Sequence, residues 1–110
     1  MVKKFKKGDI IYLNFNPQKG HEQQGRRSAI VVTNDLYNKM CNLTFVCPIT
    51  YTDNKHPFHV PLNSQTITHG VILCEQLKSL DLTKRDAEFK ETAPKEIVEE
   101  VVDIIKGFIE

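Results

Sequence analysis

The residues best suited to chemistry are concentrated in a polar segment of the chain that ends at Arg27. The string GHEQQGRR, residues 20–27, holds a histidine, a carboxylate, two glutamines and two arginines. Arginine suits phosphate, because its planar fork donates two parallel hydrogen bonds and keeps its charge at any working pH. Gly20 and Gly25 let the backbone turn and approach a ligand closely. The segment is therefore a candidate phosphate-binding loop. The alternative is a solvated loop whose arginines pair with Glu22 or with the acids near the C-terminus.

Familiar metal and nucleotide motifs are missing from the sequence. It contains no GxxxxGK[ST], no HExxH and no aspartate-rich calcium loop, so we predict neither a metal site nor a cofactor. The four histidines are His21, His56, His59 and His69. They share no short motif, and a pair of them acting as acid and base is only an open alternative. Because His59 alternates with Phe58 and Val60, we expect its side chain to point outward from a strand.

The elements that must position these residues are mostly strands. Apolar and β-branched runs predict strands at residues 10–15, 28–33, 43–50, 58–62 and 71–76, and the run at 28–33 is apolar on both faces, as in a central strand. Pro48 suggests that the third strand is an edge or carries a bulge. Residues 36–40 and 75–82 are expected to form single turns of helix.

The end of the chain has a helical period. Apolar residues recur at offsets typical of one helix face, with Thr92 as a candidate cap and Pro94 in the first turn. We expect Ile97, Val101, Ile104 and Phe108 to be buried. Short strands followed by one helix predict a small, twisted, mostly antiparallel barrel of five strands covered by that helix. Such a small sheet leaves an apolar face that favours dimerisation.

Size and composition set further bounds. At 110 residues and 12.7 kDa, with 40% hydrophobic residues, the chain fits one domain, residues 1–110. No apolar run approaches the roughly 20 residues that span a bilayer, so we expect no membrane-spanning segment. No apolar segment follows the N-terminal lysines, so we expect no secretory signal and a cytoplasmic protein. Of Cys41, Cys47 and Cys74, the last two lie in apolar runs and are expected to be buried thiols rather than disulfide partners.

Charge is distributed unevenly along the chain. Residues 1–85 contain 12 Lys and Arg against 6 Asp and Glu, a net charge of +6, whereas residues 86–110 contain 3 against 8, a net charge of −5. A basic body can present a positive face to a polyanion. The alternative is simply a solvated acidic helix at the end of the chain.

The order of the motifs carries a specific resemblance. The strings GDIIYLNFNPQKGHEQQGRRSAIVV, VCPIT, HPFHVPL and GVILCEQLKSLD follow one another from Gly8 to about Asp81. In this order they resemble the MazF/PemK family of toxin endoribonucleases. Two departures are Ser28, where the family usually has proline, and the pair Asn14 and Asn16, where acidic residues are common. We expect these departures to affect the rigidity of the loop and the RNA sequence that is preferred. Neither departure removes a reacting group.

The resemblance implies a fold, an activity and partners. Members of the family have an SH3-like β barrel, act as homodimers and cut single-stranded RNA at short sequences without a metal. The implied products are a 2′,3′-cyclic phosphate and a 5′-OH, and the implied partner is a small antitoxin whose acidic and apolar segment blocks the RNA groove. Arg27 and Thr50 match the catalytic arginine and threonine, and Glu22 matches a loop carboxylate that supports activity.

Physical chemistry agrees with these roles. If a 2′-OH attacks the neighbouring phosphate, the transition state gains negative charge, which Arg27 can hold and to which Thr50 can donate a hydrogen bond. Glu22, with His21 behind it, is the candidate base, and the role stays unassigned. Specific readout of single-stranded RNA requires side chains that bond base edges or stack on bases. The residues that we expect to bind RNA are Lys19, His21, Gln23, Gln24, Arg26, Glu75 and Gln76.

Two other functions remain open at this point. The same barrel is used by CcdB-like toxins, which poison gyrase by binding it and have no nuclease chemistry, since fold alone does not fix function. A divalent-metal nuclease is a weaker alternative, because the sequence shows no cluster of carboxylates.

Overall fold

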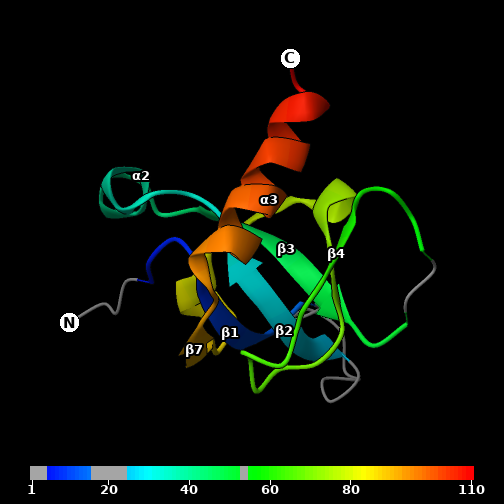
Figure 1. Cartoon of the computed structure of the whole chain (residues 1–110). Helices are drawn as coiled ribbons and strands as arrows, with labels where there is room; N and C mark the ends of the chain where they lie inside the picture. Colours follow the sequence, from blue (N-terminus) through cyan, green and yellow to red (C-terminus); the bar gives the residue numbers. More distant parts are fainter. Residues whose placement is uncertain (1–4, 16–24, 53–54) are drawn as a thin grey trace.

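The computed structural model describes residues 5–15, 25–52 and 55–110, which form one antiparallel sheet and two α-helices (Figure 1). The strands are β1 (Asp9–Asn14), β2 (Arg26–Val31), β3 (Thr44–Thr50), β4 (His59–Pro61), β5 (Val71–Leu73), β6 (Lys78–Leu80) and β7 (Glu88–Thr92). The helices are α2 (Asp35–Met40) and α3 (Lys95–Gly107), with 3₁₀ turns η1 (Cys74–Gln76) and η2 (Leu82–Lys84). The strand order is β4-β5-β3-β2-β1-β7, and β6 pairs with β3. The prediction of a mainly β fold with a C-terminal helix is confirmed.

The central strands follow from their apolar sequences. β2 lies between β1 and β3, as predicted for a run that is apolar on both faces. The prediction that Pro48 marks an edge is wrong, because β3 is internal and Pro48 pairs with Ala29 of β2. On its other side β3 pairs with β6 up to Val46 and with β5 from Ile49 onward. Pro48 lies between the part of β3 that pairs with β6 and the part that pairs with β5. Its missing N–H therefore removes no hydrogen bond from the β3–β6 or the β3–β5 pairing that the structure describes.

Two short strands were not predicted from the sequence. β6 falls inside residues 75–82, expected to form a turn of helix, of which only the two ends are helical, in η1 and η2. β7 pairs with β1 along a largely exposed edge. The predicted barrel of five strands is therefore a sheet of seven. The helical turn expected at residues 36–40 is confirmed as α2, where the Asn34 side chain accepts a hydrogen bond from the Tyr37 amide.

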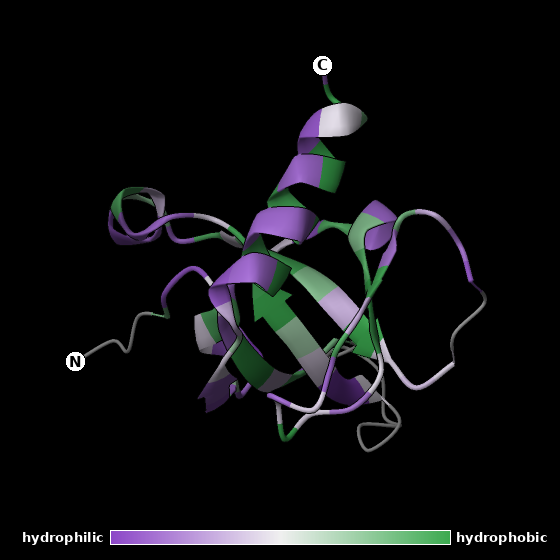
Figure 2. Ribbon diagram, viewed as in Figure 1, coloured by the Kyte–Doolittle hydropathy of each residue, from purple (hydrophilic) through white to green (hydrophobic). Residues whose placement is uncertain are grey.

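Alternation along the strands produces two apolar clusters. Ile10 packs with α3, whereas Ile11 and Leu13 point to the other face and pack with Val31 and Val46. Figure 2 shows apolar residues gathered on the strands and on one side of α3. Cys47 and Cys74 are buried in the first cluster, as predicted for structural thiols. No helix among the described residues is long and apolar enough to cross a membrane.

The terminal helix differs from its prediction in two details. Pro94 is the N-cap and no side chain caps the helix, whereas Thr92, the predicted cap, ends β7. The buried residues are Ile97, Val101 and Ile105, while Ile104 is only partly buried and Phe108 is 41% exposed. The C-terminal half of α3 projects beyond the sheet (Figure 1), so the predicted burial of Phe108 is wrong.

Candidate functional site

A cationic pocket lies beside the part of the sheet that α3 covers. The row of strand residues under α3 consists of Ile10, Ile30 and Cys47. The same face continues two residues further along each strand with Tyr12, Ser28 and Ile49, which line the pocket. The cavity encloses about 330 Å³ and is also lined by Arg26, Arg27, Thr50, Tyr51, His69 and Lys90. This volume is near the lower end for ligand pockets.

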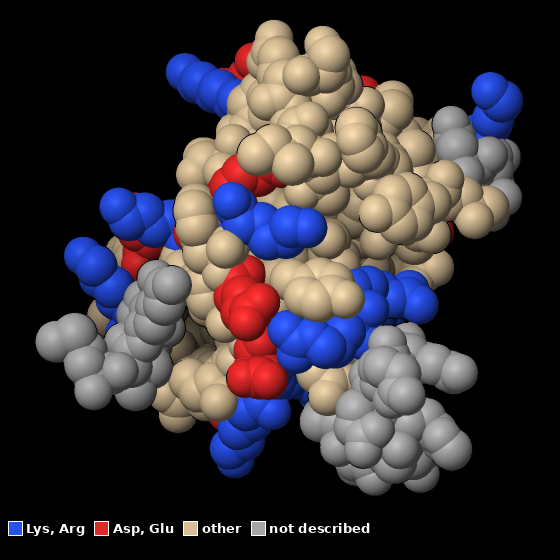
Figure 3. Space-filling view, turned by 90° about the horizontal axis from the view of Figure 1, so that it is seen from below, with Lys and Arg blue, Asp and Glu red and all other residues tan. Residues whose placement is uncertain are grey.

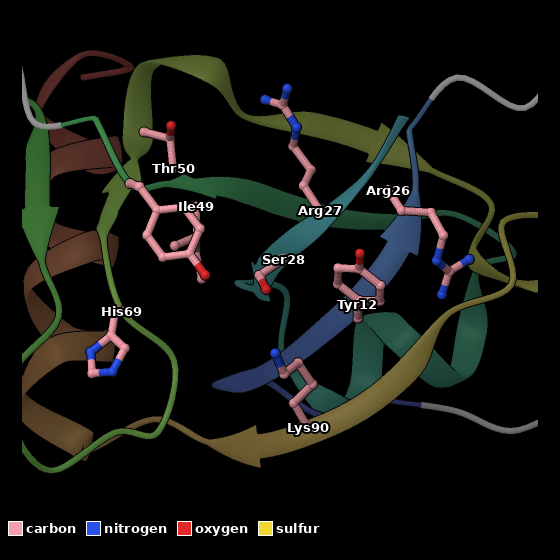
Figure 4. A pocket seen from close by; sticks show the side chains of 9 residues that line it. Tyr12, Arg26, Arg27, Ser28, Ile49, Thr50, His69 and Lys90 are labelled. Carbon is pink, nitrogen blue, oxygen red and sulfur yellow. The ribbon is translucent and has the colours of Figure 1, made fainter. Parts of the chain in front are cut away.

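The pocket brings together Arg27 and Thr50, the two predicted catalytic residues that the structure describes. β2 and β3 are in register at Ala29 and Pro48, and each predicted residue lies two positions beyond that pair along its own strand. Both side chains therefore emerge on the same face at adjacent strand ends. Figure 4 shows them on the same rim of the opening, with His69 and Lys90 across from them.

The two rim residues are accessible to a ligand. Arg27 is exposed, and among the described residues its guanidinium makes no ion pair. The Thr50 hydroxyl oxygen accepts a hydrogen bond from the Thr52 amide at 3.4 Å, which leaves the hydroxyl proton available for donation.

Arg26 has a different environment from Arg27. Its guanidinium lies 4.7 Å from the centre of the Tyr12 ring, 3.5 Å from a carboxylate oxygen of Asp86 and 3.8 Å from one of Glu88. Lys90 lies over the same ring at 5.5 Å. Figure 3 shows the basic side chains of this face next to acidic ones. The two carboxylates and the Tyr12 ring therefore hold Arg26 in place, and the Tyr12 ring is in contact with Arg26 and Lys90.

The opposite rim is formed by a loop that passes close to β3. Gly70, at φ +125°, has no room for a side chain, since a Cβ there would overlap with the Thr50 carbonyl oxygen. The Glu91 carboxylate of β7 accepts hydrogen bonds from the Ile67 amide at 3.0 Å and from the amide and hydroxyl of Thr68, both at 2.7 Å. These contacts fix the loop that carries His69 into the pocket.

Replacing Glu91 by glutamine is expected to lower the free energy of unfolding by about 1 kcal/mol at pH 7. Burial raises the pKa of Glu91, but its bonds to Ile67 and Thr68 outweigh this and hold the pKa below its usual value. A depressed folded-state pKa gives stability above the unfolded-state value of about 4.3, and that stability is lost as the pH falls through the folded-state pKa.

Urea unfolding at pH 7 and pH 3 measures this contribution. Glu91→Gln should lose less stability between the two pH values than the unchanged protein, and Glu100→Gln, on the exposed side of α3, should behave like the unchanged protein. An identical pH dependence in Glu91→Gln and the unchanged protein would contradict the assignment.

Other predicted site residues are not in the pocket. Lys19, His21, Glu22, Gln23 and Gln24 lie outside the described residues. Glu75 and Gln76 lie in η1, which packs near α3 and β4, and neither lines the pocket. The expected outward orientation of His59 is wrong, because its side chain is 5% exposed and its Nε2 lies 3.1 Å from a Glu75 oxygen.

Six lining residues were not predicted from the sequence as site residues: Tyr12, Ser28, Ile49, Tyr51, His69 and Lys90. Tyr51 directly follows Thr50, and Tyr12 is the polar-tipped aromatic residue in an otherwise apolar strand, so both carried a weak signal. His69 and Lys90 reach the pocket only through the loop–β7 and β7–β1 pairings, which no local pattern encodes.

The described lining combines two arginines, a lysine, a histidine and several hydroxyl groups, and it contains no carboxylate. This arrangement attracts a phosphate group, and its donors can stabilise negative charge that develops there. The flat face of Tyr51, which is 84% exposed, is of the kind on which unstacked bases bind.

Comparison with known proteins gives a consistent result. Residues 6–109 match the family described as the PemK-like, MazF-like toxin of type II toxin-antitoxin systems. The endoribonuclease toxin ChpB of Escherichia coli K12 is 38% identical, with both chains covered completely, and the endoribonuclease toxin MazF of the same strain is 38% identical over 82% of this chain and 81% of its own.

Solved structures agree in fold. The crystal structure of MazF (Form-I) from Deinococcus radiodurans superposes with a TM-score of 0.86 at 35% identity, covering 98% of each chain. A MazE-MazF structure (Form-III) from the same organism gives 0.87 at 33% identity, covering 97% of each chain. The match of family, sequence and fold over nearly the whole length shows that the chain belongs to the PemK-like, MazF-like toxin family of type II toxin-antitoxin systems.

Proposed function

We propose that this protein is an endoribonuclease toxin that cleaves single-stranded mRNA at specific short sequences without a metal ion. The observation that carries the proposal is the meeting of Arg27 and Thr50 at one cationic pocket. The relatives named above are endoribonucleases, which supports the same reaction class here. Nothing comparable supports the gyrase-binding alternative.

The reaction that suits this pocket is internal transesterification. The 2′-OH attacks the adjacent phosphorus, the bond from phosphorus to the 5′ oxygen breaks, and the products carry a 2′,3′-cyclic phosphate and a 5′-OH. Negative charge grows on the non-bridging oxygens, where the Arg27 fork and the Thr50 hydroxyl act as donors. The exposed Tyr51 provides a stacking surface for a neighbouring base.

A proton must leave the 2′-OH, and another must reach the 5′ oxygen. Glu22, with His21 beside it, is the base that the sequence favours, and both lie outside the described residues. Within the described lining of the pocket, His69 is the imidazole, the side chain most often used for proton transfer in catalysis. We propose Glu22 as the base and His69 as the proton donor.

Mapping the ends of a long RNA cut by the purified protein tests the function directly. We expect cuts confined to one short sequence, 5′-OH ends on the downstream fragments, and the same rate with EDTA or with added magnesium. Intact RNA would refute the nuclease assignment, and activity that EDTA abolishes and magnesium restores would refute the metal-free reaction.

Replacing Thr50 by valine is expected to slow cleavage by roughly 10–100-fold, because one hydrogen bond to a charged phosphate contributes about 1.5–3 kcal/mol. Valine keeps the shape and β-branching, so the fold should persist. Thr50→Ser retains the hydroxyl and is the matched control, expected to stay within severalfold of the unchanged protein. Single-turnover rates at saturating protein measure both, and equal rates for the valine and serine variants would contradict the role.

The proposed partner is a cognate antitoxin with an acidic and apolar segment that covers the RNA-binding groove. The MazE-MazF structures of Deinococcus radiodurans support a complex of this kind. The net charge of +6 on residues 1–85 is complementary to an acidic segment.

We also propose that residues 1–110 form one domain, that this domain acts as a homodimer and that the protein works in the cytoplasm.

Dimerisation is supported by an apolar groove between α3 and the sheet. Among the residues that line this groove are Val32, Phe45, Leu77, Val102 and Ile109. Ile109 is 71% exposed and Phe108 41% exposed, so burial against a second copy would remove apolar area from water. Sedimentation equilibrium gives the mass in solution.

A further inference from the structure

Two imidazoles and a carboxylate meet at a place distinct from the cationic pocket. They belong to His56 in the loop before β4, His59 in β4 and Glu75 in η1, and one donor atom of each lies within 4.8 Å of the other two. None of the three lines the cationic pocket. We propose that His56, His59 and Glu75 bind a divalent transition-metal ion of the zinc type, at a site separate from RNA cleavage.

The donor set and its spacing suit such an ion. Zinc binds imidazole nitrogen and carboxylate oxygen at about 2.0–2.2 Å, which in tetrahedral geometry places the donors roughly 3.3 Å apart. Nε2 of His59 and Oε2 of Glu75 are already 3.1 Å apart. The two imidazole rings lie with centroids 5.0 Å apart, so closure requires only a shift of the exposed His56 ring. Three protein ligands leave a fourth position for water.

The buried state of His59 distinguishes this cluster from an ordinary surface group. Its side chain is 5% exposed, and its Nδ1 is buried with no hydrogen-bond partner among the described residues. Here the ring has one polar contact in the described structure, and that contact is the Glu75 carboxylate.

A metal ion would occupy a place where the two groups now share a proton. Nε2 of His59 lies 3.1 Å from Oε2 of Glu75, and an ion bound between these atoms displaces the proton that joins them.

Metal binding has a specific structural consequence at His56. Its Nδ1 accepts a hydrogen bond from the Phe58 amide at 3.1 Å. If Nδ1 binds the metal its lone pair is used, and if Nε2 binds then Nδ1 carries the proton, so the bond to Phe58 opens in either case. The Phe58 amide is therefore a reporter of occupancy that does not depend on RNA.

The test is a calorimetric titration of the full chain with Zn²⁺ after removal of metal with a chelator. Cys41→Ser serves as the background in every sample, because Cys41 is the cysteine that is not buried. We expect one ion per chain, with binding weakened at least about tenfold in both His59→Gln and Glu75→Gln. His69→Ala, which removes a histidine outside the cluster, should bind zinc as the background does.

Amide NMR of the same samples provides the second readout. Zinc should shift the Phe58 amide in the background protein and, at the same zinc concentration, shift it less in Glu75→Gln. Glu75 is exposed, so this variant should keep the fold. Absence of zinc binding, or equal affinity in Glu75→Gln and the background, would overturn the proposal. Because neither readout involves RNA, failure of the metal site is distinguishable from failure of the nuclease assignment.

Discussion

Arg27→Ala is expected to lower kcat/KM for RNA cleavage by roughly 10²–10³, the loss of about 3–4 kcal/mol of transition-state stabilisation that one preorganised donor provides. Arg27 lies at the rim of the cationic pocket beside the end of β3, where it can reach the same phosphate as Thr50. The fold should be unaffected, because Arg27 is exposed and, in the described part of the chain, makes no ion pair. Circular dichroism and the melting temperature check this.

Two variants separate the guanidinium fork from charge in general. Arg27→Lys keeps the charge but cannot donate two parallel bonds to one phosphate, so its rate should fall between those of the alanine variant and the unchanged protein. Lys84→Ala removes one positive charge from η2, outside the pocket, and should leave the rate unchanged at moderate salt. A folded Arg27→Ala protein that cuts RNA at the original rate would end the proposed mechanism.

The sequence predicted a strand correctly where an apolar run in the sequence coincides with side chains that the structure buries. β1, β2 and β3 each bury residues on both faces, so their apolar runs predicted them. β7 was missed because its side chains are mostly exposed and it is held by backbone pairing with β1. Arg27 and Thr50 were predicted as catalytic residues from an ordered set of motifs, because neither residue type alone distinguishes a catalytic group from an ordinary strand residue, and the structure shows that both line one pocket.

The contact between His59 and Glu75 illustrates what a linear pattern cannot provide. Alternation along β4 indicated an outward side chain, because Val60 is buried and His59 is on the opposite face. His59 pairs with Leu73, and η1 begins at the next residue, so that Glu75, two residues after Leu73, lies against the His59 ring. The contact between His59 and Glu75 therefore depends on the register of β4 and β5 and on the residue at which β5 ends and η1 begins.

The prediction that Ile104 is buried is off by one position, and the reason is the geometry of the helix. With 3.6 residues per turn, Ile104 and Ile105 both lie near the apolar face, and the tilt of α3 over the sheet decides which of them is buried. The structure buries Ile105 and leaves Ile104 partly exposed. Phe108 lies past the sheet edge, where it contacts Phe58 at a ring distance of 5.0 Å.

Val101→Asp is therefore expected to destabilise the protein more than Ile104→Asp. Val101 is completely buried between α3 and the sheet, and an unpaired carboxylate there costs at least about 3 kcal/mol. That is a large part of the 5–15 kcal/mol typical of a small domain, so the melting transition should shift strongly downward or disappear. The partly buried Ile104 can turn a carboxylate toward water, which makes its loss smaller.

The control for this comparison is Leu36→Asp, which makes the same kind of apolar-to-acid change at a side chain that is 70% exposed in the first turn of α2. A carboxylate near a helix N-terminus is favourable, so its stability should stay within about 0.5 kcal/mol of the unchanged protein. Val101→Ala, which only removes methyl groups, should give an intermediate loss and a measurable urea transition if the aspartate variant does not fold. An unchanged melting temperature in Val101→Asp would mean that α3 does not cover the sheet in solution, and the cationic pocket, which begins where that cover ends, would then have no defined wall.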